Sequence, residues 1–292
     1  MTFKLLLLGM RPKTLAAAIV PPLVSLCYAR SENFEVSLII LNCVLLALFL
    51  QIATNFYNDG IDKIKGADEE RVGPQRLGGQ HKIEPKVLMR IGHSFIALAF
   101  LVAIPIFLKG GLIYLLLGFL SAFLAYGYTG GPYPLAYLGL GELFVFIFFG
   151  LVATVGSFHI TTGELDKNIF IIGSLIGLLS TTLIAINNFR DRDLDKKVGK
   201  RTLATRISKD SYLKLMDVFL FLPFVITLYL IIKVKLSYLI LLLIAGAAHR
   251  IRHLVRNYQH PDELNIGLGL AGKQLVLFAV LFWLGSLWQP AM

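Results

Sequence analysis

The sequence has few charged residues and few cysteines for its length. Charged residues make up only 16% of the 292 residues, and the mean hydropathy is +0.72. A soluble globular domain carries about 25% charged residues, so water cannot be the only solvent of this chain. The two cysteines, Cys27 and Cys43, both lie within apolar runs, which gives neither a disulfide framework nor metal-site spacing. We interpret them as small buried apolar residues.

Apolar residues, by contrast, are abundant and gather in long runs. They make up 56% of the chain, and a membrane-spanning helix needs about 20 mostly apolar residues. Runs of this kind occupy residues 14–30, 36–57, 91–108, 111–127, 138–158, 169–188, 213–231, 236–249 and 267–287. We therefore predict an all-α integral membrane protein of about nine transmembrane helices, which forms a single domain over residues 1–292.

Basic residues, which give the chain a net charge of +10, gather in alternate connections between these runs. Cytoplasmic loops carry such a bias, so we expect a multi-pass protein of the inner or plasma membrane with a cytoplasmic N-terminus. The basic residues do not form one continuous face, so the lipid bilayer and not nucleic acid is the expected partner. Arg11, Pro12 and Lys13 follow the first short apolar stretch, where a signal peptide would carry a small-residue cleavage site, so we expect this stretch to be retained.

Two polar motifs follow the second and the sixth apolar run, both on the expected cytoplasmic side. The first polar motif is QIATNFYNDGIDKIKGADEERVGPQR at 51–76, and the second is INNFRDRDLDKKVGKRTLA at 186–204. If the helices continue into the motifs, oxygen-bearing side chains share one helical face in each. These side chains are Asn55, Asp59 and Asp62 in the first motif and Asn188, Asp191 and Asp195 in the second. Their echo suggests a weak internal duplication that would bring the motifs face to face.

Clustered carboxylates at a membrane boundary require a compensating positive charge, because like charges repel and desolvation is costly. Magnesium prefers oxygen ligands and shares its coordination with substrate phosphates, while Arg and Lys bind phosphate well. The motifs therefore predict a magnesium–diphosphate site. Solvated loop charges are the simpler interpretation of Lys82, Lys86, Arg90, Lys209 and Lys214, whereas Arg192 and Asp193 lie away from the Asn188 face.

The motifs resemble those of the UbiA superfamily of membrane prenyltransferases, and within it those of the 1,4-dihydroxy-2-naphthoate polyprenyltransferases of menaquinone synthesis. The stretches that carry the resemblance are RPKTL at 11–15, NFYNDGIDKIKGADEERVGPQR at 55–76, YTGGPYPLAYLGLGE at 128–142 and NNFRDRDLDKKVGKRTLA at 187–204. The resemblance implies helices around a central cavity, with the motif loops at its cytoplasmic end. One departure is that Gly66 stands where the family usually has a third acid, and Asp68 comes later.

Residue roles follow from the resemblance, position by position. It implies that magnesium and catalysis depend on Asp59, Asp62, Asp191 and Asp195, with Asn55 as a further metal ligand. The side chains implied to bind the diphosphate are Arg11, Asn55, Lys65, Arg71, Arg76, Arg190, Lys200 and Arg201. Those expected beside the acceptor or the allylic cation are Asn58, Tyr128, Glu142 and Asn188. As an acid within the membrane, Glu142 would orient the acceptor or act as a general base. It could instead be a structural partner of a neighbouring helix.

The implied reaction is the Mg²⁺-dependent transfer of a polyprenyl group from polyprenyl diphosphate to dihydroxynaphthoate, with loss of CO2. Aromatic faces would shield the allylic cation, and the candidates are Tyr57, Phe123, Tyr126, Tyr128 and Phe148. Two alternatives stay open. The acceptor could be 4-hydroxybenzoate, homogentisate or a similar ring, or the protein could be a membrane transporter, although a transporter would place its acids near the bilayer midplane.

Overall fold

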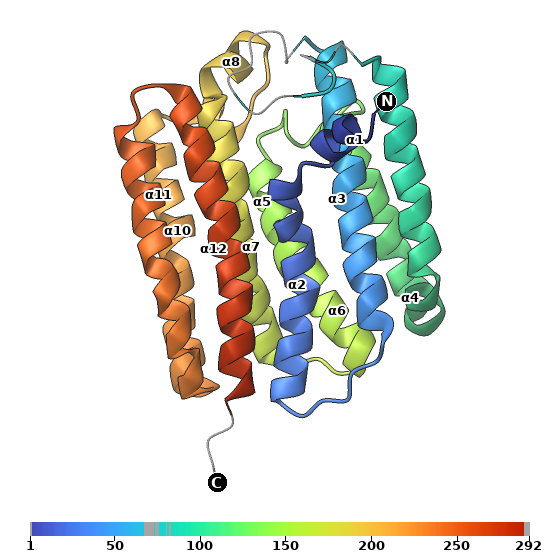
Figure 1. The fold of residues 1–292 in the computed structure, drawn as a ribbon, viewed down its shortest axis with the longest axis vertical. Helices are drawn as coiled ribbons and strands as arrows, with labels where there is room; N and C mark the ends of the chain where they lie inside the picture. Colours follow the sequence, from blue (N-terminus) through green and yellow to red (C-terminus); the bar gives the residue numbers. More distant parts are fainter. Residues whose placement is uncertain (1, 67–72, 74–75, 80, 82, 289–292) are drawn as a thin grey trace.

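The computed structural model describes residues 2–66, 73, 76–79, 81 and 83–288, and the regular elements of these residues are all helices (Figure 1). The first half contains α1 (Phe3–Met10), α2 (Pro12–Ser31), α3 (Ile39–Ile64), α4 (Pro85–Gly127), α5 (Gly141–Val145), the π-helix η1 (Phe146–Val152) and α6 (Ala153–Thr162). The second half contains α7 (Lys167–Arg190), α8 (Arg192–Lys197), α9 (Leu203–Arg206), α10 (Lys209–Lys233), η2 (Leu236–Ile244), α11 (Ala245–Asn257), η3 (Pro261–Glu263) and α12 (Leu264–Leu287).

Eight helical stretches among the described residues are long and apolar enough to cross a membrane. One of them, α4, has 43 residues, about 65 Å at 1.5 Å per residue, or roughly twice the ~30 Å hydrocarbon core of a bilayer. Gly111 interrupts it with φ 64° and ψ −154°, a backbone conformation that glycine tolerates. The chain turns back there, and the rings of Phe100 and Phe119, one from each arm, lie 4.9 Å apart. The prediction of about nine spans is confirmed, since the two arms match the runs 91–108 and 111–127.

Local signals explain where several helices begin and end. The Asp166 side chain accepts a hydrogen bond from the Asn168 amide at the start of α7, and Ser208 caps α10 in the same way through Ser211. Such caps satisfy backbone N–H groups that have no partner within the helix. Gly163 ends α6 with a left-handed φ of 83°. These signals set where α6 ends and where α7 and α10 begin.

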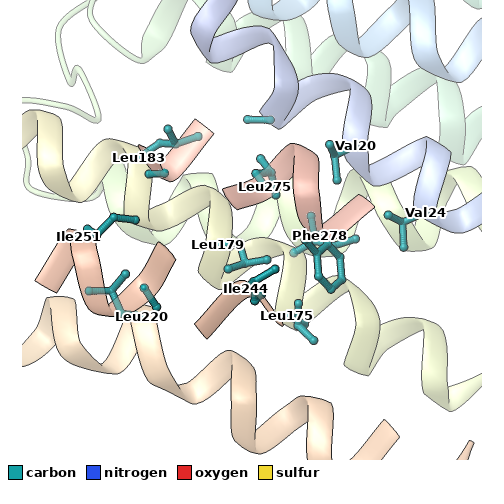
Figure 2. Close-up of a cluster of buried hydrophobic side chains, with 14 of the residues drawn as sticks. Val20, Val24, Leu175, Leu179, Leu183, Leu220, Ile244, Ile251, Leu275 and Phe278 are labelled. Atoms are coloured by element: carbon teal, nitrogen blue, oxygen red, sulfur yellow. The ribbon is translucent and has the colours of Figure 1, made fainter. Parts of the chain in front are cut away.

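The hydrophobic core lies on the side of the bundle formed by α2, α7, α10, η2–α11 and α12 (Figure 2). Its buried side chains include Val20, Val24, Leu175, Leu179, Leu183, Leu220, Ile244, Ile251, Leu275 and Phe278. On the other face of α7, glycines permit close helix contact, since a Cβ on Gly150 would lie 2.6 Å from the Gly177 Cα. Helices in lipid associate through such close packing, so α7 packs on both sides and separates this core from the rest of the bundle.

The described residues of both polar motifs lie at the same end of the bundle, at the top of Figure 1, where α3 ends and α8 begins. We call this the motif end. The short helix α1 lies across it, and Gly9 packs so tightly that a Cβ there would be 2.6 Å from Phe56 and Leu77. Arg11 turns the corner from α1 to α2 with a left-handed φ of 52°. This corner holds Arg11 beside the end of α3.

Candidate active site

A cavity of about 320 Å³ runs between α2, α3, α4, α5–η1–α6 and α7. Most of its wall is apolar, and its polar residues concentrate at the motif end. The polar residues that line this end are Arg11, Thr14, Gln51, Thr54, Asn55, Asn58, Asp62, Arg76, Tyr128, Thr129, Asn187, Asn188 and Lys200. An apolar chain with a charged head group fits such a cavity, because each part meets a matching environment.

The first polar motif places two buried carboxylates against two guanidinium groups. Asp59 and Asp62 are 1% and 2% exposed. Asp59 forms an ion pair with Arg11 and Asp62 with Arg76, while the Arg76 Nε lies 3.6 Å from Asp59 Oδ1. The Asp59 Oδ2 also accepts a hydrogen bond from the Leu77 amide at 3.2 Å. Segments before α2, on α3 and after α3 therefore meet in one cluster of paired charges.

The second polar motif repeats this pairing. The Arg190 guanidinium donates to both oxygens of Asp191, with Nε–Oδ1 at 2.7 Å and Nη2–Oδ2 at 2.8 Å. Arg190 also donates to the Asn187 Oδ1 at 2.7 Å. Lys200 lies 3.6 Å from the buried Asp195. Each of the four motif aspartates thus pairs with a basic side chain that the sequence had assigned to the diphosphate.

Tyr137, in the connection before α5, links the two motifs. Its hydroxyl donates to Asp62 Oδ1 at 3.5 Å, and the Nζ atoms of Lys65 and Lys200 lie 3.9 and 5.6 Å from its ring centroid. Burial, and then the carboxylates of Asp62 and Asp195, raise the pKa of Tyr137. Partial desolvation lowers the pKa of Lys65. The two motifs therefore share one electrostatic environment.

The residues expected beside the acceptor lie together at this end. Asn58, Tyr128 and Asn188 line the cavity, whereas the buried Glu142 lies behind Asn188. The Glu142 Oε1 accepts hydrogen bonds from Asn188 Nδ2 at 2.9 Å and from the Tyr212 hydroxyl at 2.5 Å. Its Oε2 has no hydrogen-bond partner among the described residues. The geometry therefore makes Glu142 a partner that orients Asn188.

Some predicted diphosphate ligands do not reach the cavity. Arg201 is exposed, and Arg190 faces Asp191 and Asn187. Arg71 and Asp68 lie outside the described residues. Of the two residues predicted to lie away from the Asn188 face, Asp193 is exposed, while Arg192 donates to the backbone oxygens of Ala204 and Ile207.

The aromatic wall differs from the prediction. Phe123 is 68% exposed and Tyr126 is 37% exposed, and the hydroxyl of the buried Tyr57 hydrogen-bonds to His93 Nδ1 at 2.6 Å. None of these three rings lines the cavity, so the geometry gives no support to their assignment to the allylic cation. The rings that do line it are Phe107, Tyr114, Tyr128, Phe144, Phe148 and Phe149. Phe107, Tyr114, Phe144 and Phe149 were not predicted, although Phe144 lies four residues before Phe148 on the same helical face.

The oxygen donors fit a magnesium ion that shares its ligands with a substrate. Across the described part of the chain, no three acidic, histidine or cysteine side chains form a group that could hold a metal. The motifs instead offer two carboxylates each, with the Asn55 amide on the cavity wall. Magnesium is commonly held by one or two carboxylates together with substrate phosphates. This donor set therefore suits an ion bridged to a diphosphate, not one enclosed by protein ligands.

Comparison with known proteins identifies the family. A 1,4-dihydroxy-2-naphthoate octaprenyltransferase of Haemophilus influenzae is 31% identical, over 95% of this chain and 94% of that protein. One of Bacillus subtilis is 34% identical, over 66% of this chain and 63% of that protein. A solved UbiA homolog from Archaeoglobus fulgidus bound to GPP and Mg²⁺ shares the fold, with a TM-score of 0.65 at 16% identity over 96% of this chain and 98% of that one. Residues 18–267 match the UbiA prenyltransferase family, and the chain therefore belongs to this family of membrane enzymes that transfer prenyl groups.

Proposed function

We propose that the enzyme joins the polyprenyl chain of a polyprenyl diphosphate to 1,4-dihydroxy-2-naphthoate, with release of pyrophosphate and CO2, as a magnesium-dependent step of menaquinone synthesis. The observation that carries the proposal is the convergence of Arg11, Arg76 and Lys200, from three separate segments, on the polar end of an apolar cavity. The acceptor is supported by the relatives that are named for naphthoate prenyl transfer.

The basic side chains would bind the diphosphate by exchanging their partners. Arg11, Arg76 and Lys200 now neutralise carboxylates, and each can turn to a phosphate oxygen, where Arg binds bidentately. The residues that would then hold the metal are Asn55, Asp59, Asp62, Asp191 and Asp195. When bound, magnesium stabilises the negative charge that develops on the leaving pyrophosphate.

The aromatic wall of the cavity suits the bond changes of the transfer. The C–O bond of the prenyl diphosphate breaks with its electron pair on pyrophosphate, and a ring carbon of the acceptor forms the new C–C bond. If that carbon carries the carboxylate, departure of CO2 returns an electron pair to the ring, so no proton acceptor is required. Phe144 and Phe148, stacked with centroids 5.9 Å apart, would shield the cation through their faces, and the apolar wall would exclude water.

Purified enzyme in detergent tests this proposal, with radiolabelled prenyl diphosphate and a panel of dihydroxynaphthoate, 4-hydroxybenzoate and homogentisate. We expect transfer to dihydroxynaphthoate, abolished by EDTA, with one labelled CO2 released per product from carboxyl-labelled acceptor. Asp59→Asn and Asp191→Asn should lower the rate by roughly 100-fold or more, whereas Asp193→Asn, at the exposed neighbouring acid, should not. Transfer to another acceptor alone would reject the naphthoate assignment, and full activity of the two site variants would reject the site.

We also propose that the motif end faces the cytoplasm in the cell membrane, because the basic connections gather there. Labelling of Asp193→Cys by a membrane-impermeant maleimide tests this orientation. We expect reaction in inside-out vesicles and protection in intact cells. The reverse pattern would place the motif end outside.

A further inference from the structure

The cavity continues from the polar motifs almost to the opposite end of the bundle. On α3, its lining residues run from Asp62 at the motif end to Cys43 near the start of the helix. These positions are separated by about 28 Å at a rise of 1.5 Å per residue, close to the ~30 Å hydrocarbon thickness of a bilayer. The cavity therefore has a defined far end, distant from the chemistry.

Packed apolar side chains close this far end. Cys43, Ile106 and Ile160 line the cavity there, and each is at most 7% exposed. They belong to one buried cluster, against which Phe107 and Tyr114 pack. We call these five residues the cavity floor. A chain that reaches the floor can go no farther along this axis without displacing a side chain.

The bend of α4 builds the floor from both of its arms. Phe107 precedes and Tyr114 follows the turn at Gly111, whose φ of 64° is left-handed, and both rings line the cavity. Gly118 leaves no room for Phe107 to retreat, because a Cβ there would lie 2.7 Å from the ring. The Phe107 ring is therefore held between the two arms.

Hydrogen bonds fix the second ring. The Tyr114 hydroxyl lies 2.7 Å from His159 Nδ1 and 3.1 Å from the Gly156 carbonyl oxygen, and the Tyr114 and His159 rings stack at 5.9 Å and 5°. The hydroxyl group of Tyr114 thus finds its hydrogen-bond partners on α6, as a buried hydroxyl requires. The aromatic ring of Tyr114 is therefore held in place where it lines the cavity.

We propose that Phe107 and Tyr114 form a stop that sets the length of prenyl tail transferred best, an inference that rests on the proposed function. Each added isoprene unit buries more apolar surface in the cavity until the end of the tail reaches the floor. A longer tail must then fold back or leave part of itself outside the cavity. A mismatch of methylene size in an apolar pocket changes the specificity ratio by about tenfold or more, so the stop should be measurable.

Competition between donors tests the stop. Geranylgeranyl and octaprenyl diphosphate are supplied together with one acceptor, and the ratio of the two products gives the ratio of kcat/KM. Phe107→Ala and Tyr114→Ala should each shift this ratio toward the longer product by about tenfold. Ala47→Phe, which adds a ring to the cavity wall one turn from Cys43, should shift it toward the shorter product.

Two matched variants show whether ring volume at the floor is responsible. Phe123→Ala removes the same ring from the exposed outer face of α4 and should leave the ratio unchanged. Tyr114→Phe keeps the ring but loses the hydroxyl, and should also leave it unchanged. Because both products form in one sample, partial unfolding of a variant lowers both and does not change their ratio.

An unchanged ratio in Phe107→Ala, Tyr114→Ala and Ala47→Phe, with transfer preserved, would overturn the stop and indicate that the tail leaves the cavity sideways into lipid. Failure of the proposed function would appear differently, as absence of transfer with every donor length. The length preference would then be read from competitive binding of the same two donors, with the same expected shifts.

Discussion

Replacement of Arg76 by alanine should destabilise the magnesium-free enzyme and increase the stabilisation that magnesium gives. Arg76 is 6% exposed, pairs with Asp62, and has its Nε 3.6 Å from Asp59. Removal of one partner of a buried ion pair costs about 3–5 kcal/mol, because the other charge is left uncompensated. We expect about 3 kcal/mol, the lower end of that range, since Arg11 still neutralises Asp59. Magnesium would supply the missing positive charge and recover much of this loss.

Thermal unfolding in detergent, with EDTA and with magnesium, measures both effects. Arg76→Ala combined with Asp62→Asn should recover most of the lost stability without magnesium, because neither charge then remains alone. Lys214→Ala, which breaks the exposed pair with Asp210, is the control and should change nothing. Equal stability of Arg76→Ala and wild type, or equal stabilisation of both by magnesium, would refute the idea that the guanidinium and the metal compete for the same carboxylates.

Three further predictions follow from other parts of the structure. Tyr212→Phe removes the 2.5 Å hydrogen bond to the buried Glu142 and should cost about 1–3 kcal/mol of unfolding free energy; unchanged thermal unfolding would contradict this. Gly150→Ala places a Cβ 2.6 Å from the α7 backbone and should cost about 1–3 kcal/mol, whereas Gly246→Ala, with no atom within 4 Å, should be neutral or slightly stabilising. Partial desolvation lowers the pKa of Lys65, so its charge is lost at a lower pH than that of an ordinary lysine. The Lys65→Arg variant should therefore keep its affinity for the diphosphate donor at a higher pH than wild type does. If the affinities of both proteins fall at the same alkaline pH, Lys65 does not contact the donor.

Two features could be predicted from the sequence: which segments cross the membrane, and that the two motifs lie at the same end of the bundle. Apolar runs mark the spans because lipid excludes charge, and four spans separate the motifs, so both lie at the same end. The charge pairs could not be predicted in this way. Arg11 lies 48 residues from Asp59 and Arg76 lies 14 residues from Asp62, and no periodicity links such positions. The first contact depends on how the chain turns from α1 to α2 beside α3, and the second on how the segment after α3 folds back onto it.

The aromatic wall shows why side-chain direction is harder to predict in a membrane protein. In a soluble helix, polar residues mark the outer face, but lipid is as apolar as a protein core. Phe123 and Phe148 therefore occur in similar apolar surroundings in the sequence, although one is exposed and the other lines the cavity. Glycines give a partial signal. The pair at 110–111 marks the boundary between two apolar runs, but it does not reveal that the two arms of α4 meet and close the cavity.

The pairing of all four motif aspartates with basic side chains suggests how a charged donor enters a site of low dielectric. A diphosphate alone would have to take Arg and Lys from carboxylates that then stay unpaired, and magnesium alone would leave the basic groups unpaired. If both were bound, the carboxylates would turn to the metal and the guanidinium groups to the phosphate, and little net charge would be added to the cavity.

Because each uncompensated buried charge is costly, the affinities for donor and metal should be strongly coupled, and the coupling must be reciprocal. Titration of a prenyl diphosphate with and without magnesium, and of magnesium with and without the donor, should show the same tenfold or larger gain in both directions, since a coupling above about 1.4 kcal/mol corresponds to that factor. Independent affinities would mean that the ion pairs remain in place when the donor binds.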